Sequence, residues 1–204
     1  MTLFNEQELD QLAQTVSDAE KRTDAEIVTV LTHASDNYRF IPTLWAAMLA
    51  LLTPATLNWS PFWLERWDLI IAQLAVFTIL ALMFQIPALR YYLIPKKIKK
   101  QRAALMARRL FLEQGVYNTK DRTGVLIFVS EVEHYVEIMV DKGISDHIGD
   151  SEWQEVIATF TQQVKAGKAL VGFEQCVINV TDILSTVVPA TSEKNERENR
   201  LVVI

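Results

Sequence analysis

Two long uncharged stretches constrain this chain more than any other feature. Residues 40–57 and 69–86 each run for 18 positions without Asp, Glu, Lys or Arg. As α-helix, such a stretch covers about 27 Å, close to the roughly 30 Å hydrocarbon core of a bilayer. A chain of 204 residues can hardly bury two such segments on all sides in a soluble core. We therefore expect a transmembrane helical hairpin over residues 40–89, with its second helix free to extend through Leu89.

Aromatic residues gather at the edges of both stretches. The connection between them contains Trp59, Trp63 and Trp67, and Tyr91 and Tyr92 follow the second stretch. Rings with one polar end concentrate where hydrocarbon meets the headgroups. These five side chains are therefore predicted at the membrane interface.

The charges are distributed unevenly along the chain. It contains 20 basic and 25 acidic residues, but the segment 90–109 contains eight basic and no acidic ones. The remaining 12 basic residues face all 25 acidic ones, which gives that part a formal charge of −13. Such an acidic body argues against nucleic acid as a partner, because binding a polyanion requires neutralising its phosphates.

The basic segment predicts how the hairpin is oriented. Lys96, Lys97, Lys99 and Lys100 lie just beyond the second stretch, whereas the connection contains only Arg66 as a basic residue. Because positive residues stay on the cytoplasmic side, both termini should be cytoplasmic in a two-helix protein of the bacterial inner membrane. The four lysines are predicted to lie at the membrane interface and to attract anionic lipid headgroups.

The rest of the chain predicts one α/β domain that the hairpin interrupts. Its parts are residues 1–39 and 90–188, followed by a polar tail over 189–204 whose last four residues could join a sheet edge. Strands are expected at 25–32, 124–129 and 134–141, and helices at 5–22, 98–114, 150–166 and 173–188.

The connections between the strands predict the sheet. The first two strands are joined by a long crossover and should be parallel, whereas a short turn makes the third antiparallel to the second. The expected fold class is α/β, a small mixed sheet with helices on its faces.

Residues 23–28, 115–127, 136–144 and 167–173, together with Trp153, follow the pattern of a known family. They resemble the TPM domain, a family named after a thylakoid lumen protein, a photosystem II repair protein and an acetylcholine-receptor modulator. The resemblance extends over about residues 4–36 and 103–187 and is greatest to bacterial membrane proteins with spans inserted after the first strand. It implies an α/β/α sandwich and offers a LemA-like membrane protein as a partner. It also implies either acid phosphatase activity, as ascribed to a plant member, or calcium binding, as ascribed to bacterial ones.

Acidic residues mark one expected edge of the sheet. They lie where the first and second strands begin and the third ends, and neighbouring strands are only about 4.8 Å apart. Oxygen ligands of this kind suit Ca²⁺ or Mg²⁺, so a site for either ion is one hypothesis. Its predicted ligands are Asp24, Glu26, Asp121, Asp141, Asp146 and Asp150. The alternative is a solvated acidic rim in which Asp150 caps a helix.

Catalytic motifs give little support to an enzyme. Cys176 has Asp182, not Arg, six residues later, so a cysteine-phosphatase loop is absent, and no phosphate-binding glycine loop occurs. His33, His134 and His147 are scattered and expected at the surface. We expect a binding or regulatory module, with a metal-dependent phosphatase at the same acidic edge as the alternative.

Overall fold

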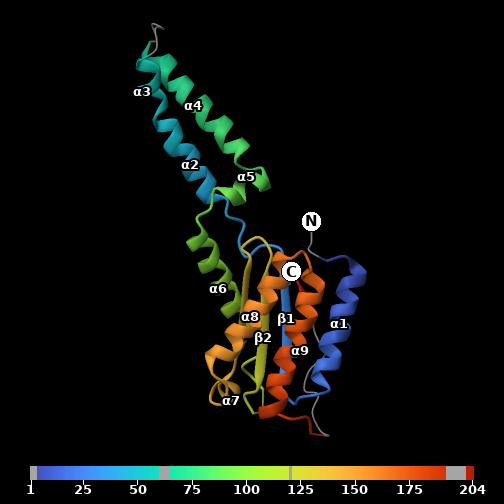
Figure 1. Cartoon of the computed structure of the whole chain (residues 1–204). Helices are drawn as coiled ribbons and strands as arrows, with labels where there is room; N and C mark the ends of the chain where they lie inside the picture. Colours follow the sequence, from blue (N-terminus) through green and yellow to red (C-terminus); the bar gives the residue numbers. More distant parts are fainter. Residues whose placement is uncertain (1–3, 60–64, 120, 192–200) are drawn as a thin grey trace. The chain divides into compact units, whose positions relative to one another are not determined.

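The computed structural model describes residues 4–59, 65–119, 121–191 and 201–204 (Figure 1). They divide into two compact units, which we call the helical unit (residues 36–99) and the α/β unit (residues 1–35 and 100–204). The helical unit contains the two uncharged stretches. Each unit is described by itself below.

The α/β unit is built on a mixed sheet with the strand order β3-β2-β1-β4. Strand β1 (Glu26–Thr32) pairs in parallel with β2 (Gly124–Ser130), and β2 pairs antiparallel with β3 (Tyr135–Val140). Strand β4 (Leu201–Val203) adds to the free edge of β1, also in parallel. The predicted fold class and strand directions are therefore confirmed.

Helices cover both faces of this sheet, as Figure 1 shows. Helices α1 (Glu6–Glu20), α8 (Asp150–Lys165) and α9 (Ala169–Val187) bury one face in the larger core. Helix α6 (Lys96–Glu113), which begins in the helical unit, covers the other face with small residues such as Ala103 and Ala107. All seven residues of β2 are buried, as its uninterrupted apolar sequence predicts.

Local sequence signals fix several element ends. Asn5 and Glu8 form a reciprocal capping box at the start of α1. Gly115 has φ 63° just after α6, and Gly167 has φ 76° just after α8, conformations in which glycine avoids a side-chain clash. A Cβ atom on Gly124 would lie 1.9 Å from the carbonyl oxygen of Val116, so only glycine fits where β2 starts.

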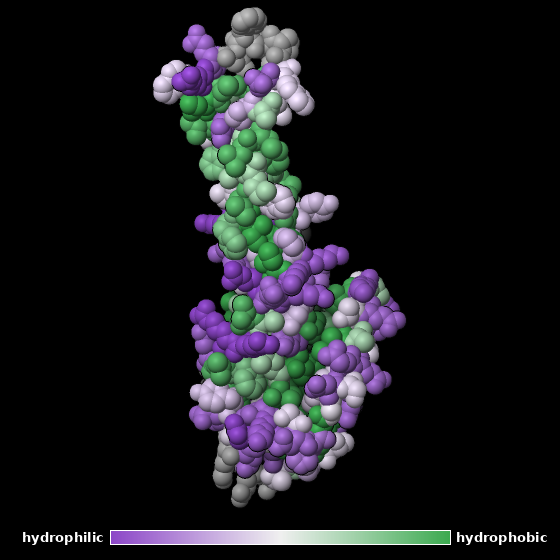
Figure 2. Space-filling view, turned by 90° about the vertical axis from the view of Figure 1, so that its left-hand side faces the viewer, coloured by the Kyte–Doolittle hydropathy of each residue, from purple (hydrophilic) through white to green (hydrophobic). Residues whose placement is uncertain are grey.

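The helical unit contains α2 (Phe40–Leu51), α3 (Thr53–Asn58), α4 (Arg66–Met83) and α5 (Pro87–Tyr92). Helices α2 and α3 both pack against α4. Most of their apolar side chains point outward, and Figure 2 shows hydrophobic surface over these helices. No residue of α4 is buried.

The second span ends earlier than predicted. Helix α4 stops at Met83 instead of continuing through Leu89, and α5 begins at Pro87. Proline lacks an N–H and forces the preceding residue out of the helical conformation, and Ile86 is indeed extended with ψ 123°. The first span is likewise interrupted at Leu52, just before Pro54.

In the described part of the chain three helical segments, not two, are long and apolar enough to cross a membrane: Phe40–Asn58, Arg66–Met83 and Ala169–Val187. The third was predicted as a helix of the α/β domain, and its 18-residue window is 39% buried, against none for Arg66–Met83. Its buried side chains, among them Phe173 and Val177, belong to the core of the α/β unit.

Candidate functional site

The predicted acidic edge of the sheet exists as a meeting point of strand ends. Glu26 lies opposite Gly124 in the register of β1 and β2, and the Asp141 N–H donates to the Gly124 carbonyl at 2.9 Å. The starts of β1 and β2 and the end of β3 therefore lie side by side, as the strand order requires.

The carboxylates at this edge bind protein groups. Asp24 accepts hydrogen bonds from the backbone N–H and the hydroxyl of Thr191, at 2.9 and 2.5 Å. Asp141 is buried, accepts from the Lys142 N–H at 2.6 Å, and lies 3.7 Å from Nε of Arg122. Its second oxygen, Oδ2, has no hydrogen-bond partner among the described residues.

The remaining predicted ligands lie outside the strands. Asp121 is exposed in the turn before β2, and Asp146 ends the short helix α7 (Lys142–Ser145). Gly149, and not Asp150 as predicted, is the N-cap of α8. Asp150 is the first helical residue, where its negative charge interacts favourably with the helix dipole.

No group of three or more His, Cys, Asp or Glu side chains in the described part of the chain is arranged to hold a metal ion. The described geometry therefore gives no fit for a resident Ca²⁺ or Mg²⁺. The ligand set Asp24, Glu26, Asp121, Asp141, Asp146 and Asp150 stays a prediction.

A second group of polar residues lies at the opposite edge, where β1 and β2 end. Glu133 is buried and accepts hydrogen bonds from the Ser35 N–H at 3.1 Å and from the Ser130 hydroxyl. The Ser35 hydroxyl donates to that of Ser130 at 3.0 Å. This network joins the segment after β1 to the turn after β2, two regions almost 100 residues apart in the sequence.

Further contacts strengthen the same connection, which we call the junction (residues 32–35 and 130–134). The N–H groups of Glu131 and Val132 donate to the carbonyls of Thr32 and His33, at 3.1 and 3.0 Å. The Glu131 carboxylate also lies 2.8 Å from Nδ1 of His33. Glu131 and Glu133 are thus buried members of the junction.

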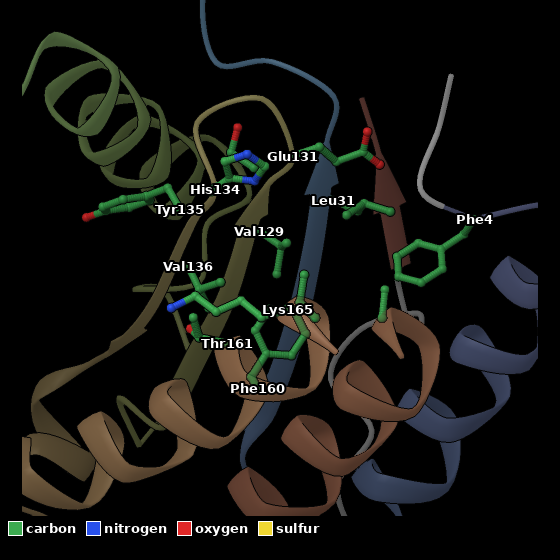
Figure 3. A pocket seen from close by; sticks show the side chains of 13 residues that line it. Phe4, Leu31, Val129, Glu131, His134, Tyr135, Val136, Phe160, Thr161 and Lys165 are labelled. Carbon is green, nitrogen blue, oxygen red and sulfur yellow. The ribbon is translucent and has the colours of Figure 1, made fainter. Parts of the chain in front are cut away.

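A cavity of about 310 Å³ opens beside the junction (Figure 3). Leu31 and Val129 form its wall on the sheet, Phe160 rises from α8, and Phe4 closes the side next to α1. Val136 of β3 completes the apolar lining. In open α/β sheets, ligands bind at the carboxyl ends of parallel strands, which is where this cavity lies.

Polar groups surround the opening of the cavity. Glu131, His134 and Lys165 line it, together with the backbone-bonded hydroxyl of Thr161. The Tyr135 hydroxyl points away from the cavity and donates to Glu137 at 3.0 Å. Burial, followed by the nearby Glu137 charge, raises the pKa of Tyr135 to about 12, so this phenol stays neutral. Lys165 is exposed and has no ion pair among the described residues.

The predicted interface residues lie at the ends of the helical unit's helices. Trp59, Trp67 and Tyr92 are strongly exposed, and Lys96, Lys97 and Lys100 are exposed at the start of α6. Lys99 is half-buried, and Tyr91 packs edge-on against the buried Tyr38 with ring centroids 6.3 Å apart. Trp63 lies outside the described residues.

Comparison with known proteins supports the resemblance over the second part of the chain. A family model described as the TPM domain matches residues 89–183. Residues 89–183 are therefore similar to a TPM domain. The match runs from α5 to α9 and so includes the β2–β3 turn and the cavity residues of α8. The resemblance of residues 4–36, which provide α1 and β1, lies outside it.

One solved structure extends the likeness to nearly the whole chain. The solution structure of the BA42 protein from the psychrophilic bacterium Bizionia argentinensis covers 98% of this chain and 94% of its own, with a TM-score of 0.61 and 18% identity. At this identity the likeness is one of fold. A comparison with curated proteins found no match.

Proposed function

We propose that this chain is a two-span protein of the bacterial inner membrane whose cytoplasmic α/β unit, containing the TPM domain, is a binding or regulatory module. The observation that favours this most is α4, an apolar helix of 18 residues with none buried. Exposing so much apolar surface to water is costly, whereas hydrocarbon accommodates it at no cost.

The third apolar helix does not need a membrane to cover it. The apolar stripe of α9, which includes Cys176, Val180 and Leu184, is buried among α1, α8 and the sheet. A helix that already contributes its apolar side to a soluble core has a polar side left over, here with Gln175, Asn179 and Asp182. We therefore assign only the helices of residues 40–58 and 66–83 to the bilayer.

A binding role fits the side chains better than catalysis does. Burial raises the pKa of the Cys176 thiol to about 12, so this cysteine is not a nucleophile near neutral pH. The cavity beside the junction is apolar, with few polar groups at its opening, which is the usual character of a ligand pocket.

Cysteine labelling tests the membrane arrangement. Cys176→Ala removes the single native thiol, and Asp10→Cys, Trp59→Cys and Glu152→Cys then each introduce one exposed thiol. In intact spheroplasts, an impermeant maleimide should label only position 59. In inverted vesicles it should label positions 10 and 152 and leave 59 unlabelled. Positions 10 and 152 on opposite sides of the membrane would overturn the proposal.

A phosphatase would behave differently. If the acidic edge hydrolysed phosphate esters, the purified full chain with millimolar Mg²⁺ or Ca²⁺ would turn over p-nitrophenyl phosphate. That activity would fall in Asp24→Asn or Asp121→Asn. The binding module we propose shows neither turnover nor this sensitivity. Metal-dependent turnover that is lost in both variants would overturn our proposal in favour of a phosphatase.

A further inference from the structure

We propose that the cavity beside the junction binds a small amphipathic anion, a short apolar chain or ring with one carboxylate-like group. This inference rests on the proposed binding role and specifies its ligand. The apolar part would occupy the space between the sheet and α8, and the anionic group would lie at the opening beside Lys165.

The lining of the cavity selects for an apolar group. Leu31, Val129, Val136 and Phe160 present only hydrocarbon to it, and its volume of about 310 Å³ lies at the small end of ligand pockets. A cavity of this size suits a chain of several carbons more than a large cofactor. Each methylene that enters should tighten binding about fourfold until the space is filled.

The charges at the opening favour an anion. Glu131 is the acidic residue in the cavity lining, and its carboxylate is already paired with His33. Lys165 extends from α8 along the cavity toward Val136, as Figure 3 shows, and no described acidic group forms an ion pair with it. An ammonium group in this position can bind a ligand carboxylate.

A helix N-terminus adds a second positive contribution. Helix α9 begins at Ala169, which lines the cavity, and no side chain caps this end. The first N–H groups of a helix lack partners within the helix, and together with the helix dipole they attract negative charge. Lys165 at the end of α8 and the N-terminus of α9 therefore both bring positive charge to the cavity.

The direct test uses octanoate as the probe and the full chain in phosphatidylcholine nanodiscs. Saturation-transfer NMR would give dissociation constants for octanoate, hexanoate, octanol and octylamine, with empty nanodiscs subtracted. We expect octanoate to bind most tightly, hexanoate roughly fourfold weaker per methylene removed, and octylamine weakest. Equal binding of octanoate and octylamine would overturn the proposal.

Two pairs of variants place the ligand. Lys165→Gln should weaken octanoate about two- to fivefold without changing octanol, while Lys168→Gln, an exposed lysine three residues away, should change neither. Ala169→Leu fills the cavity and should abolish both, whereas Ala166→Leu, outside the lining, should abolish neither. Octanoate binding that survives Ala169→Leu would show that it binds elsewhere.

The source of the ligand is a separate arm of the test. If the acyl chain of an anionic lipid occupies the cavity, phosphatidylglycerol in the nanodisc should compete with octanoate and weaken its binding. If the ligand is water-soluble, octanoate should bind equally well in phosphatidylglycerol and in phosphatidylcholine nanodiscs. Cysteine labelling in spheroplasts and inverted vesicles, as described above, keeps the two proposals apart. Unchanged topology without octanoate binding refutes the cavity ligand alone.

Discussion

Glu20 is the last residue of α1, and its carboxyl lies partly buried at the end of the core. Burial, together with the charge of Glu26, raises its pKa from 4.5 to about 8. Because the folded-state pKa lies above that of the unfolded chain, the folded protein holds this proton more tightly. The contribution of Glu20 to the free energy of unfolding is therefore fully present below about pH 4.5, and it declines as the pH rises toward 8.

Replacing this carboxyl with an amide should remove that decline. After discounting for solvent screening at a partly exposed site, we expect Glu20→Gln to be about 1 kcal/mol more stable than the parent at pH 9 and nearly equal at pH 5. Calorimetric unfolding at both pH values measures this. Parallel pH dependence of the two proteins would contradict the assignment.

Glu133 stabilises the junction through two hydrogen bonds, from the Ser35 N–H and the Ser130 hydroxyl. In Glu133→Ala the buried Ser130 hydroxyl and the partly buried Ser35 N–H lose their acceptor, which should lower the free energy of unfolding by about 1–3 kcal/mol. Glu133→Gln keeps an acceptor oxygen, so its free energy of unfolding should lie between those of the parent and of Glu133→Ala. Glu152→Ala, at an exposed position of α8, is the matched control, and an equal loss there would refute the role of Glu133.

Among the helices, α4 and α9 have similar apolar compositions but different surroundings. Leu74 and Ile178 lie at the middle of α4 and α9, and both side chains are exposed. An Arg at the centre of a membrane span costs roughly 2.5–3.5 kcal/mol, whereas Arg on the outer face of a soluble helix costs little. Leu74→Arg should therefore reduce the fraction of chain that resists alkaline extraction, and Ile178→Arg should not. Release of both variants alike would contradict the assignment of α9 to the soluble core.

The strands and the second span show which features of the fold could be predicted from the sequence and which could not. Periodicity was sufficient for β2 and β3, because Val136, Ile138 and Val140 do face the larger core while Tyr135 and Met139 face α6. The break before Pro87 was missed because composition, and not backbone geometry, set the predicted end of the second span.

The cavity was not predictable by the same means. Its lining comes from the N-terminal segment, β1, β2, β3, α8 and the start of α9, and no spacing within one segment indicates such a meeting. The burial of Glu131 and Glu133 was not predictable for a similar reason, since their partners His33 and Ser35 precede the hairpin in the sequence.

Across the whole chain, the charge distribution is what should orient the protein in a bilayer. Replacing Lys96, Lys97, Lys99 and Lys100 by Gln removes half of the eight positive charges that follow the second span. We expect a mixture of orientations, seen as labelling of Asp10→Cys from both sides of the membrane. The corresponding four Lys→Arg changes should keep a single orientation, and mixed labelling there would contradict the charge argument.

The neighbours of β1 in the sheet are β2 and β4, and both are encoded after the helical unit. While the chain is being synthesised, β1 therefore leaves the ribosome with no strand to pair with until more than 90 further residues have followed. Both apolar helices emerge within that interval. If the hairpin enters a bilayer as we propose, its insertion can precede closure of the sheet, and a chain stalled between the two steps would present an unpaired, aggregation-prone strand.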